Sequence, residues 1–185
     1  MEQIMQKLLN LLILYFCLAL PFRVGAEGLA LSAAEIKLGD VYTESVFGPW
    51  EKRCIKAESE PNNCHMFQVL TDATRNPMLE VTMFNVPQGG QAVMAASIMT
   101  PLETLLTAEL QIQIEGEAVK SYPYSWCNKQ GCVARIGFTK NELNSLSKGT
   151  TATIFLTAAA KPTAPFALEM SLIGFTKALE SLAVR

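Results

Sequence analysis

The residues best suited to chemistry in this sequence are its five cysteines. A pair of cysteines can hold zinc, exchange disulfides or form a structural cross-link. Zinc sites favour short C-x2-C pairs and thioredoxin-like redox sites need C-x-x-C, whereas here the last four cysteines are spaced C-x9-C and C-x4-C. Of the three possible connectivities, this spacing favours two structural disulfides, Cys54–Cys64 and Cys127–Cys132. Zinc binding and redox exchange stay as alternatives.

No other side chains form a recognisable catalytic group. His65 is the sole histidine, and neither Asp40 nor Asp72 lies in a motif that would orient it as a general base. The sequence contains no G-x-S-x-G elbow, phosphate loop or dinucleotide fingerprint. Glu58 and Glu60 lack the spacing of a calcium loop and indicate a solvated acidic loop. We therefore predict a solvent-side strand histidine and no catalytic residue, metal or cofactor.

The composition excludes two broad classes of protein. The 185 residues carry 15 Lys+Arg and 17 Asp+Glu, for a formal net charge of −2, and half of them are hydrophobic. A chain this apolar and this weakly charged is not disordered. It also lacks the basic surface that a nucleic-acid-binding protein needs, so we expect no nucleic acid among its partners.

Residues 1–26 have the three parts of a secretory signal peptide. Lys7 lies in the charged region, residues 8–20 form the apolar region, and Val24-Gly25-Ala26 supplies small residues at the cleavage site. We predict cleavage after Ala26 and no transmembrane helix afterwards, because the apolar run is shorter than the ~20 residues that a spanning helix needs. An uncleaved membrane anchor is the alternative. The remaining cysteine, Cys17, would leave with the signal peptide.

The rest of the chain is expected to form a flexible leader, residues 27–45, and one domain, residues 46–185. Leu110–Ile114 alternates between apolar and polar residues, which is typical of a half-buried strand. A capping box opens a short helix over Thr139–Ser147, and Phe175–Leu182 carries a helical apolar stripe. Short strands separated by turns, without strand–helix alternation, predict a mainly β fold, an antiparallel sandwich with two short helices.

Aromatic residues are the candidate contact residues. Tyr122, Tyr124 and Trp126 alternate and would share one face of a strand, so they are the candidate binding surface if that face is exposed. Trp50 and Trp126 both lie close to a cysteine. Each is interpreted either as a core residue packed on a disulfide or as an anchor for a partner.

Several motifs occur in a fixed order between about residues 47 and 182. They are Phe47-Gly48-Pro49-Trp50-x-x-x-Cys54, Cys64-x-Met66-x-Gln68, Pro101-Leu102-Glu103-Thr104-Leu105-Leu106, Trp126-Cys127 to Gly131-Cys132-Val133-Ala134, and Ser171-Leu172-Ile173-Gly174-Phe175-Thr176. In this order and spacing they resemble the invasion-associated locus B family.

The resemblance implies an immunoglobulin-like β-sandwich, exported to the periplasm, secreted or held at the cell surface of a Gram-negative bacterium. The family is linked to host-cell invasion in pathogens and has no established catalytic residues. We therefore predict a non-enzymatic envelope protein with an unidentified protein partner in the envelope or on a host cell. The alternatives are a thiol–disulfide oxidoreductase or accessory that uses Cys127 and Cys132, and an envelope-stress or assembly factor without a fixed ligand.

Overall fold

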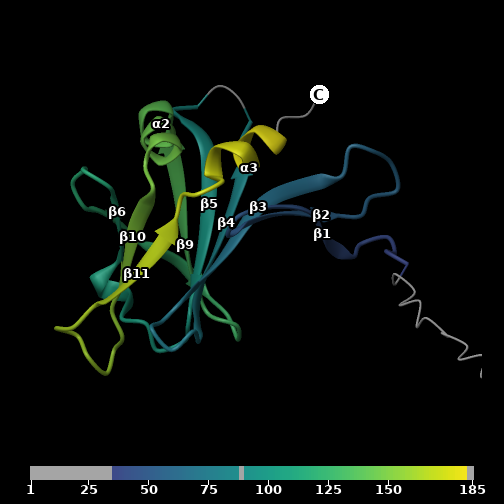
Figure 1. The fold of residues 1–185 in the computed structure, drawn as a ribbon. Helices are drawn as coiled ribbons and strands as arrows, with labels where there is room; N and C mark the ends of the chain where they lie inside the picture. The colour runs from purple at the N-terminus through teal and green to yellow at the C-terminus, as the bar shows by residue number, and fades with distance from the viewer. Residues whose placement is uncertain (1–34, 88–89, 183–185) are drawn as a thin grey trace, which may run out of the picture. The chain divides into compact units, whose positions relative to one another are not determined.

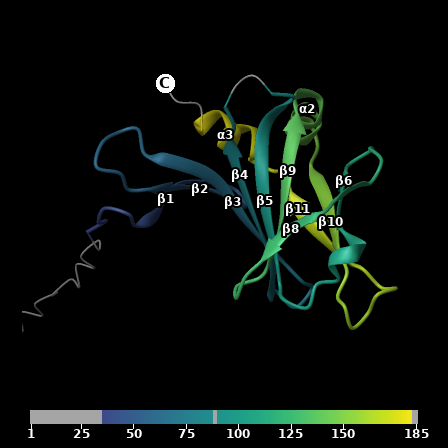
Figure 2. The ribbon, with the colours of Figure 1, turned by 180° about the vertical axis from the view of Figure 1, so that it is seen from behind.

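The computed structural model describes residues 35–87 and 90–182, so the predicted signal peptide and its cleavage site lie outside the described residues. Two antiparallel sheets make up the fold (Figures 1 and 2). The seven-stranded sheet has the order β1-β2-β3-β4-β5-β9-β8, with β1 (Val41–Phe47), β2 (Trp50–Ile55), β3 (Asn63–Thr71), β4 (Pro77–Asn85), β5 (Ala92–Thr100), β9 (Cys132–Thr139) and β8 (Tyr124–Cys127). The four-stranded sheet has the order β11-β10-β6-β7, with β11 (Phe166–Ser171), β10 (Thr151–Leu156), β6 (Leu110–Ile114) and β7 (Lys120–Tyr122). A 3-10 turn, η1 (Leu106–Ala108), precedes β6.

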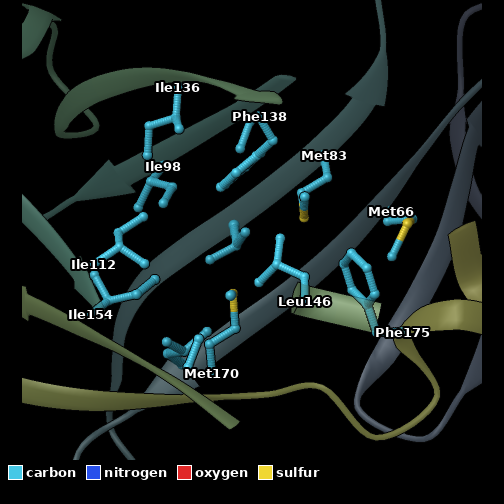
Figure 3. Packing of buried hydrophobic residues seen from close by; sticks show 14 of the residues in the cluster. Met66, Met83, Ile98, Ile112, Ile136, Phe138, Leu146, Ile154, Met170 and Phe175 are labelled. Atoms are coloured by element: carbon cyan, nitrogen blue, oxygen red, sulfur yellow. The ribbon is translucent and has the colours of Figure 1, made fainter. Parts of the chain in front are cut away.

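The core lies between the two sheets. Ile98 and Ile136 from the first sheet and Ile112 and Ile154 from the second belong to one buried cluster, and their side chains point toward one another in Figure 3. Strand β6 alternates buried and half-buried residues along its whole length, which confirms the strand predicted at Leu110–Ile114. Each such aliphatic side chain contributes about 1.5–3 kcal/mol when fully buried. The predicted mainly β, antiparallel sandwich with two short helices is confirmed.

Two short helices, α2 (Lys140–Lys148) and α3 (Phe175–Ser181), close the same end of the sandwich (Figure 1). The predicted capping box starts α2: the Glu142 backbone N–H donates to the Thr139 hydroxyl, and the Thr139 backbone N–H donates to the Glu142 carboxylate. Helix α2 buries Leu146, and α3 buries Phe175. Both predicted helices are confirmed, and their apolar residues complete the core.

The predicted boundary between leader and domain is wrong. Strand β1 begins at Val41 and pairs with β2, so residues 41–45 belong to the sheet and not to a leader over residues 27–45. The ladder extends into the preceding turn, where the Lys56 backbone exchanges hydrogen bonds with Gly39 and Asp40. The alternation of apolar and polar residues did not predict this strand, because β1 is a largely exposed edge strand. A bulge between Thr43 and Ser45 also breaks its alternation.

The turn between β1 and β2 packs tightly against the turn that leads into α3. Gly174 has a φ of 80°, and a Cβ added there would overlap the backbone carbonyl of Phe47. Glycine is required at this position for two separate reasons, the left-handed backbone and the close approach of another strand. Gly116, in the turn after β6, has nearly the same φ of 77° but open space around it.

These two glycines form a matched pair for mutation. Gly116→Ala is expected to lower the free energy of unfolding by about 1–2 kcal/mol, the cost of a left-handed alanine. Gly174→Ala adds a clash with backbone and is expected to cost more than about 3 kcal/mol. Urea unfolding of both variants measures the difference. Equal losses would mean that the Phe47 backbone does not approach Gly174 as closely as described.

Candidate functional site

Trp50, Gln68 and Ser171 form a buried junction between the two sheets. The Trp50 indole N–H donates to the Ser171 carbonyl at 2.8 Å, and the Gln68 side-chain amide donates to the same oxygen at 3.0 Å. The Ser171 backbone N–H in turn donates to the Gln68 amide oxygen at 3.0 Å. The Gln68 side chain therefore pairs with the end of β11 as a neighbouring strand would, and it ties β3 to the second sheet.

Phe175 completes this Trp50–Gln68–Ser171 junction. Its ring meets the Trp50 ring edge to face, with centroids 5.4 Å apart, and both side chains are fully buried. Such a pair contributes about 0.5–1.5 kcal/mol beyond its area. Trp50 is thus a core residue, and the interpretation as a contact anchor is wrong for it. The motif residues that meet here hold the fold together, and their polar groups bond to one another.

The two disulfides join neighbouring strands. Cys54 pairs with Cys64 between β2 and β3, and Cys127 pairs with Cys132 between β8 and β9, which confirms the pairing predicted from the spacing. In the chain-entropy model the two rings stabilise the fold by about 3 and about 2 kcal/mol, respectively. Glu44 lies close to the first bridge, but bridged sulfurs are not the thiolates that a metal needs.

The three aromatic residues predicted to share one face do not share it. Tyr122 ends β7 in the four-stranded sheet, whereas Tyr124 and Trp126 lie on β8 in the seven-stranded sheet. Pro123, between the two tyrosines, lies where the chain passes from one sheet to the other, and the pairing register shifts again between Tyr124 and Trp126. The strand assumed from the alternation is therefore two strands.

Tyr122, Tyr124 and Trp126 also differ in how deeply they are buried. Both tyrosines pack against the core, and burial raises the pKa of each hydroxyl above its ordinary value. Trp126 is 47% exposed, and its strand is an edge of the seven-stranded sheet. Of the predicted surface, Trp126 is the residue that the structure leaves in solvent, and any contact through the two tyrosines stays a prediction.

His65 lies on the outer face of β3, directly opposite Arg53 on β2. It is half-buried, and burial, together with the positive charge of Arg53, lowers its pKa. Arg53 is itself engaged: its guanidinium lies 3.5 Å from the centroid of the Phe67 ring, and its Nε donates to Glu51 at 2.8 Å. These contacts form a packed patch on the outer face of the sheet.

A hollow on the domain opens where β3 and β4 part. Pairing between these strands ends at Met66 and Met83, after which residues 63–65 pair only with β2, and residues 84–85 pair only with β5. The hollow, here called the β3/β4 notch, has a volume of about 720 Å³. Its polar lining includes Glu44, Lys52, Glu60, Asn62, His65, Asn85 and Ser181.

The loop of residues 57–63 borders this notch, and its polar side chains are ordered by mutual contacts. Asn62 donates to the two carboxylate oxygens of Glu60, from its backbone at 2.9 Å and from its side chain at 2.7 Å. The Asn62 side chain also donates to the Tyr42 hydroxyl at 3.0 Å. The acidic character of this loop was predictable from its sequence. The end of pairing between β3 and β4 was not, because no residue pattern in either strand indicates it.

Among the described residues, no helix combines the length and the apolarity that crossing a bilayer requires.

Comparisons with known proteins agree with one another. The family model described as Invasion associated locus B (IalB) protein matches residues 50–183. Two invasion protein B homologues of Brucella abortus, from strain 2308 and from biovar 1 strain 9-941, are each 26% identical over 170 residues, which cover 91% of this chain and 95% of the relative. The crystal structure of invasion associated protein b from Bartonella henselae superposes with a TM-score of 0.62 at 24% identity, over 75% of this chain and 94% of that one.

The half-buried His65 predicts a pH dependence of stability. Because burial and Arg53 lower its folded-state pKa, the unfolded chain binds a proton more readily at this site, and stability falls as pH drops below about 6.5. His65→Gln removes this proton linkage. Urea unfolding between pH 7.5 and pH 5 should therefore show a smaller loss of stability for the variant than for the native protein. An identical loss in both would contradict the assigned environment of His65.

Proposed function

Because this chain belongs to the invasion associated locus B family, we propose that it is an exported, non-enzymatic protein of the bacterial envelope whose β-sandwich binds a protein partner. The family match spans most of the described domain. Two disulfides suit an oxidising compartment such as the periplasm or the cell surface. The relatives in Brucella carry the name invasion protein B homologue, and this name supports a partner in the envelope or on a host cell.

The observation that carries the proposal is the exposed indole of Trp126 on edge strand β8. Tryptophan is the residue type most enriched among the energetic anchors of protein interfaces. The outer edge of β8, which pairs with no other strand among residues 35–87 and 90–182, also offers backbone groups to an incoming strand. Trp126 is therefore the proposed centre of the contact surface.

The hairpin that carries Trp126 is held rigid. The Cys127–Cys132 bridge closes it, and the Asn128 side-chain oxygen accepts hydrogen bonds from the backbone of Gln130 at 2.8 Å and of Gly131 at 3.2 Å. Gly131 packs so closely on the Thr100 carbonyl that a Cβ would overlap it. A rigid hairpin presents its aromatic side chain with little ordering cost on binding, which favours an anchor over an incidental exposed residue.

A photoreactive amino acid tests this surface in intact cells. Placed at position 126, it is expected to form a discrete adduct with the partner. Placed at Lys161, an exposed position in the loop between β10 and β11, it is expected to form none. Thermal unfolding of both purified variants controls for misfolding. Equal adducts from both positions, or no adduct from position 126, would count against Trp126 as the contact residue.

The rival function, thiol–disulfide exchange by Cys127 and Cys132, is favoured by one observation: Cys127 is exposed beside Trp126. The reduction potential of this bridge separates the two functions, because structural bridges lie below about −300 mV and catalytic ones lie higher. We expect a value below about −300 mV for protein isolated from the cell envelope. A markedly higher value would favour the oxidoreductase, and free thiols in a cytosolic protein would contradict export.

A further inference from the structure

The outer face of the seven-stranded sheet, which points away from the second sheet, is more apolar than a solvent-facing sheet usually is. An antiparallel sheet with one face on the core normally presents polar residues on the other. Along β5 the outward positions alternate with the buried ones and hold Val93, Ala95, Ser97 and Met99, of which one is polar. A strand that is apolar on both faces is typical of a position covered on two sides.

Two residues on this outer face are buried although they lie outside the core. Val133 and Phe67 are 4% and 6% exposed, and neither belongs to the buried cluster between the sheets. Val133 pairs with Trp126 on β8 and with Met99 on β5, and residues paired across strands share a face. Trp126 therefore borders an apolar row that runs across the outer face.

The outer face is open in the part of the chain that the structure describes. The second sheet packs on the inner face, the two helices close one end of the sandwich, and neither helix crosses the outer face in Figure 2. Strands rise about 3.4 Å per residue and lie about 4.8 Å apart, so this face measures roughly 30 Å by 30 Å. That size matches the ~800 Å² that each partner contributes to a standard interface.

Two side chains of opposite charge lie on either side of β5. Arg135 on β9 is paired with Ser97, and Glu80 on β4 is paired with Met99, so both charges are on the outer face. The outward positions of β4, β5 and β9 hold no further charged residue. The ion pairs present among residues 35–87 and 90–182 involve neither Arg135 nor Glu80.

We propose that the outer face binds a second copy of this chain through a two-fold contact. In such a contact residue i meets residue j, and residue j meets residue i. Arg135 of each copy then meets Glu80 of the other, with the apolar outward residues of β5 between the two ion pairs. A face with one unpaired charge of each sign is complementary to itself, whereas a partner surface of one sign would leave one of these charges without a counterpart.

The inference rests on the proposed function and names the partner of the same site. Because Trp126 borders the outer face, the protein that contacts Trp126 is the second copy. The adduct formed by a photoreactive amino acid at position 126 is therefore expected to have the mass of two chains.

Charge reversal tests the contact in solution. Sedimentation equilibrium of the mature chain at micromolar concentrations is expected to show a monomer–dimer equilibrium. Arg135→Glu and Glu80→Arg each place like charges at two symmetry-related contacts, and each should weaken the dimer about tenfold or more. The double variant carries both exchanges, which restores two attractive pairs, and it should dimerise as the native chain does.

Lys161→Glu is the matched control, because it makes the same change of charge in the loop between β10 and β11, away from the outer face. It should leave the dimer unchanged, and thermal unfolding of every variant controls for misfolding. A native chain that stays monomeric would overturn the inference. So would single variants that dimerise normally, a double variant that does not recover, or an equal loss in Lys161→Glu.

The cross-link at position 126 separates failure of this inference from failure of the proposed function. An adduct that joins two copies of the chain supports both. An adduct with a different protein would overturn the second copy as partner and leave the proposed function standing. A monomeric chain that forms no adduct at position 126 would contradict both.

Discussion

The single Ser171 carbonyl that accepts hydrogen bonds from both Trp50 and Gln68 is the contact on which the rest of the arrangement depends. It fixes the end of β11 against β3, and from there the chain turns at Gly174 into α3. The close packing of Gly174 on Phe47 and of Phe175 on Trp50 follows from that position. Helix α3 then brings Ser181 and Leu182 to the β3/β4 notch. Because the Trp50 and Gln68 side chains are buried, leaving the Ser171 backbone without Gln68 would cost about 1–3 kcal/mol.

The parts of the fold that local sequence determines were predictable. The alternation at Leu110–Ile114 reports one buried face, the capping box at Thr139 satisfies backbone groups within one turn, and the short cysteine spacings fit hairpins. The parts of the fold that depend on contacts between residues far apart in the sequence were not predictable. The edge strand β1 buries too little to show a pattern, and Pro123 divides an apparent strand between two sheets. The notch depends on where β3 stops pairing with β4, which no run of residues in either strand encodes.

The motifs behind the family resemblance divide into two groups in the structure. Most of their large residues, such as Trp50, Met66 and Phe175, are buried and stabilise the junction between the sheets. Leu102, Leu106, Trp126 and Ile173 belong to the same motifs but are exposed, and of these Trp126 lies on a disulfide-closed hairpin. The shared motifs thus consist mostly of residues that stabilise the fold, together with a few residues exposed on the surface. A binding function in such a protein depends on the residues exposed on its surface. The acidic loop of residues 57–63 at the notch lies between the motif that ends at Cys54 and the motif that begins at Cys64.

Both disulfides join cysteines that are close along the chain, with sequence separations of 10 and 5. Short loops close at a lower entropic cost than long ones, so during oxidative folding each correct bond is favoured over pairings that would connect distant hairpins. Each bridge also joins residues that the hydrogen-bonded ladder already places opposite each other. An oxidant alone is then sufficient for maturation, and a disulfide isomerase would find little mispairing to repair.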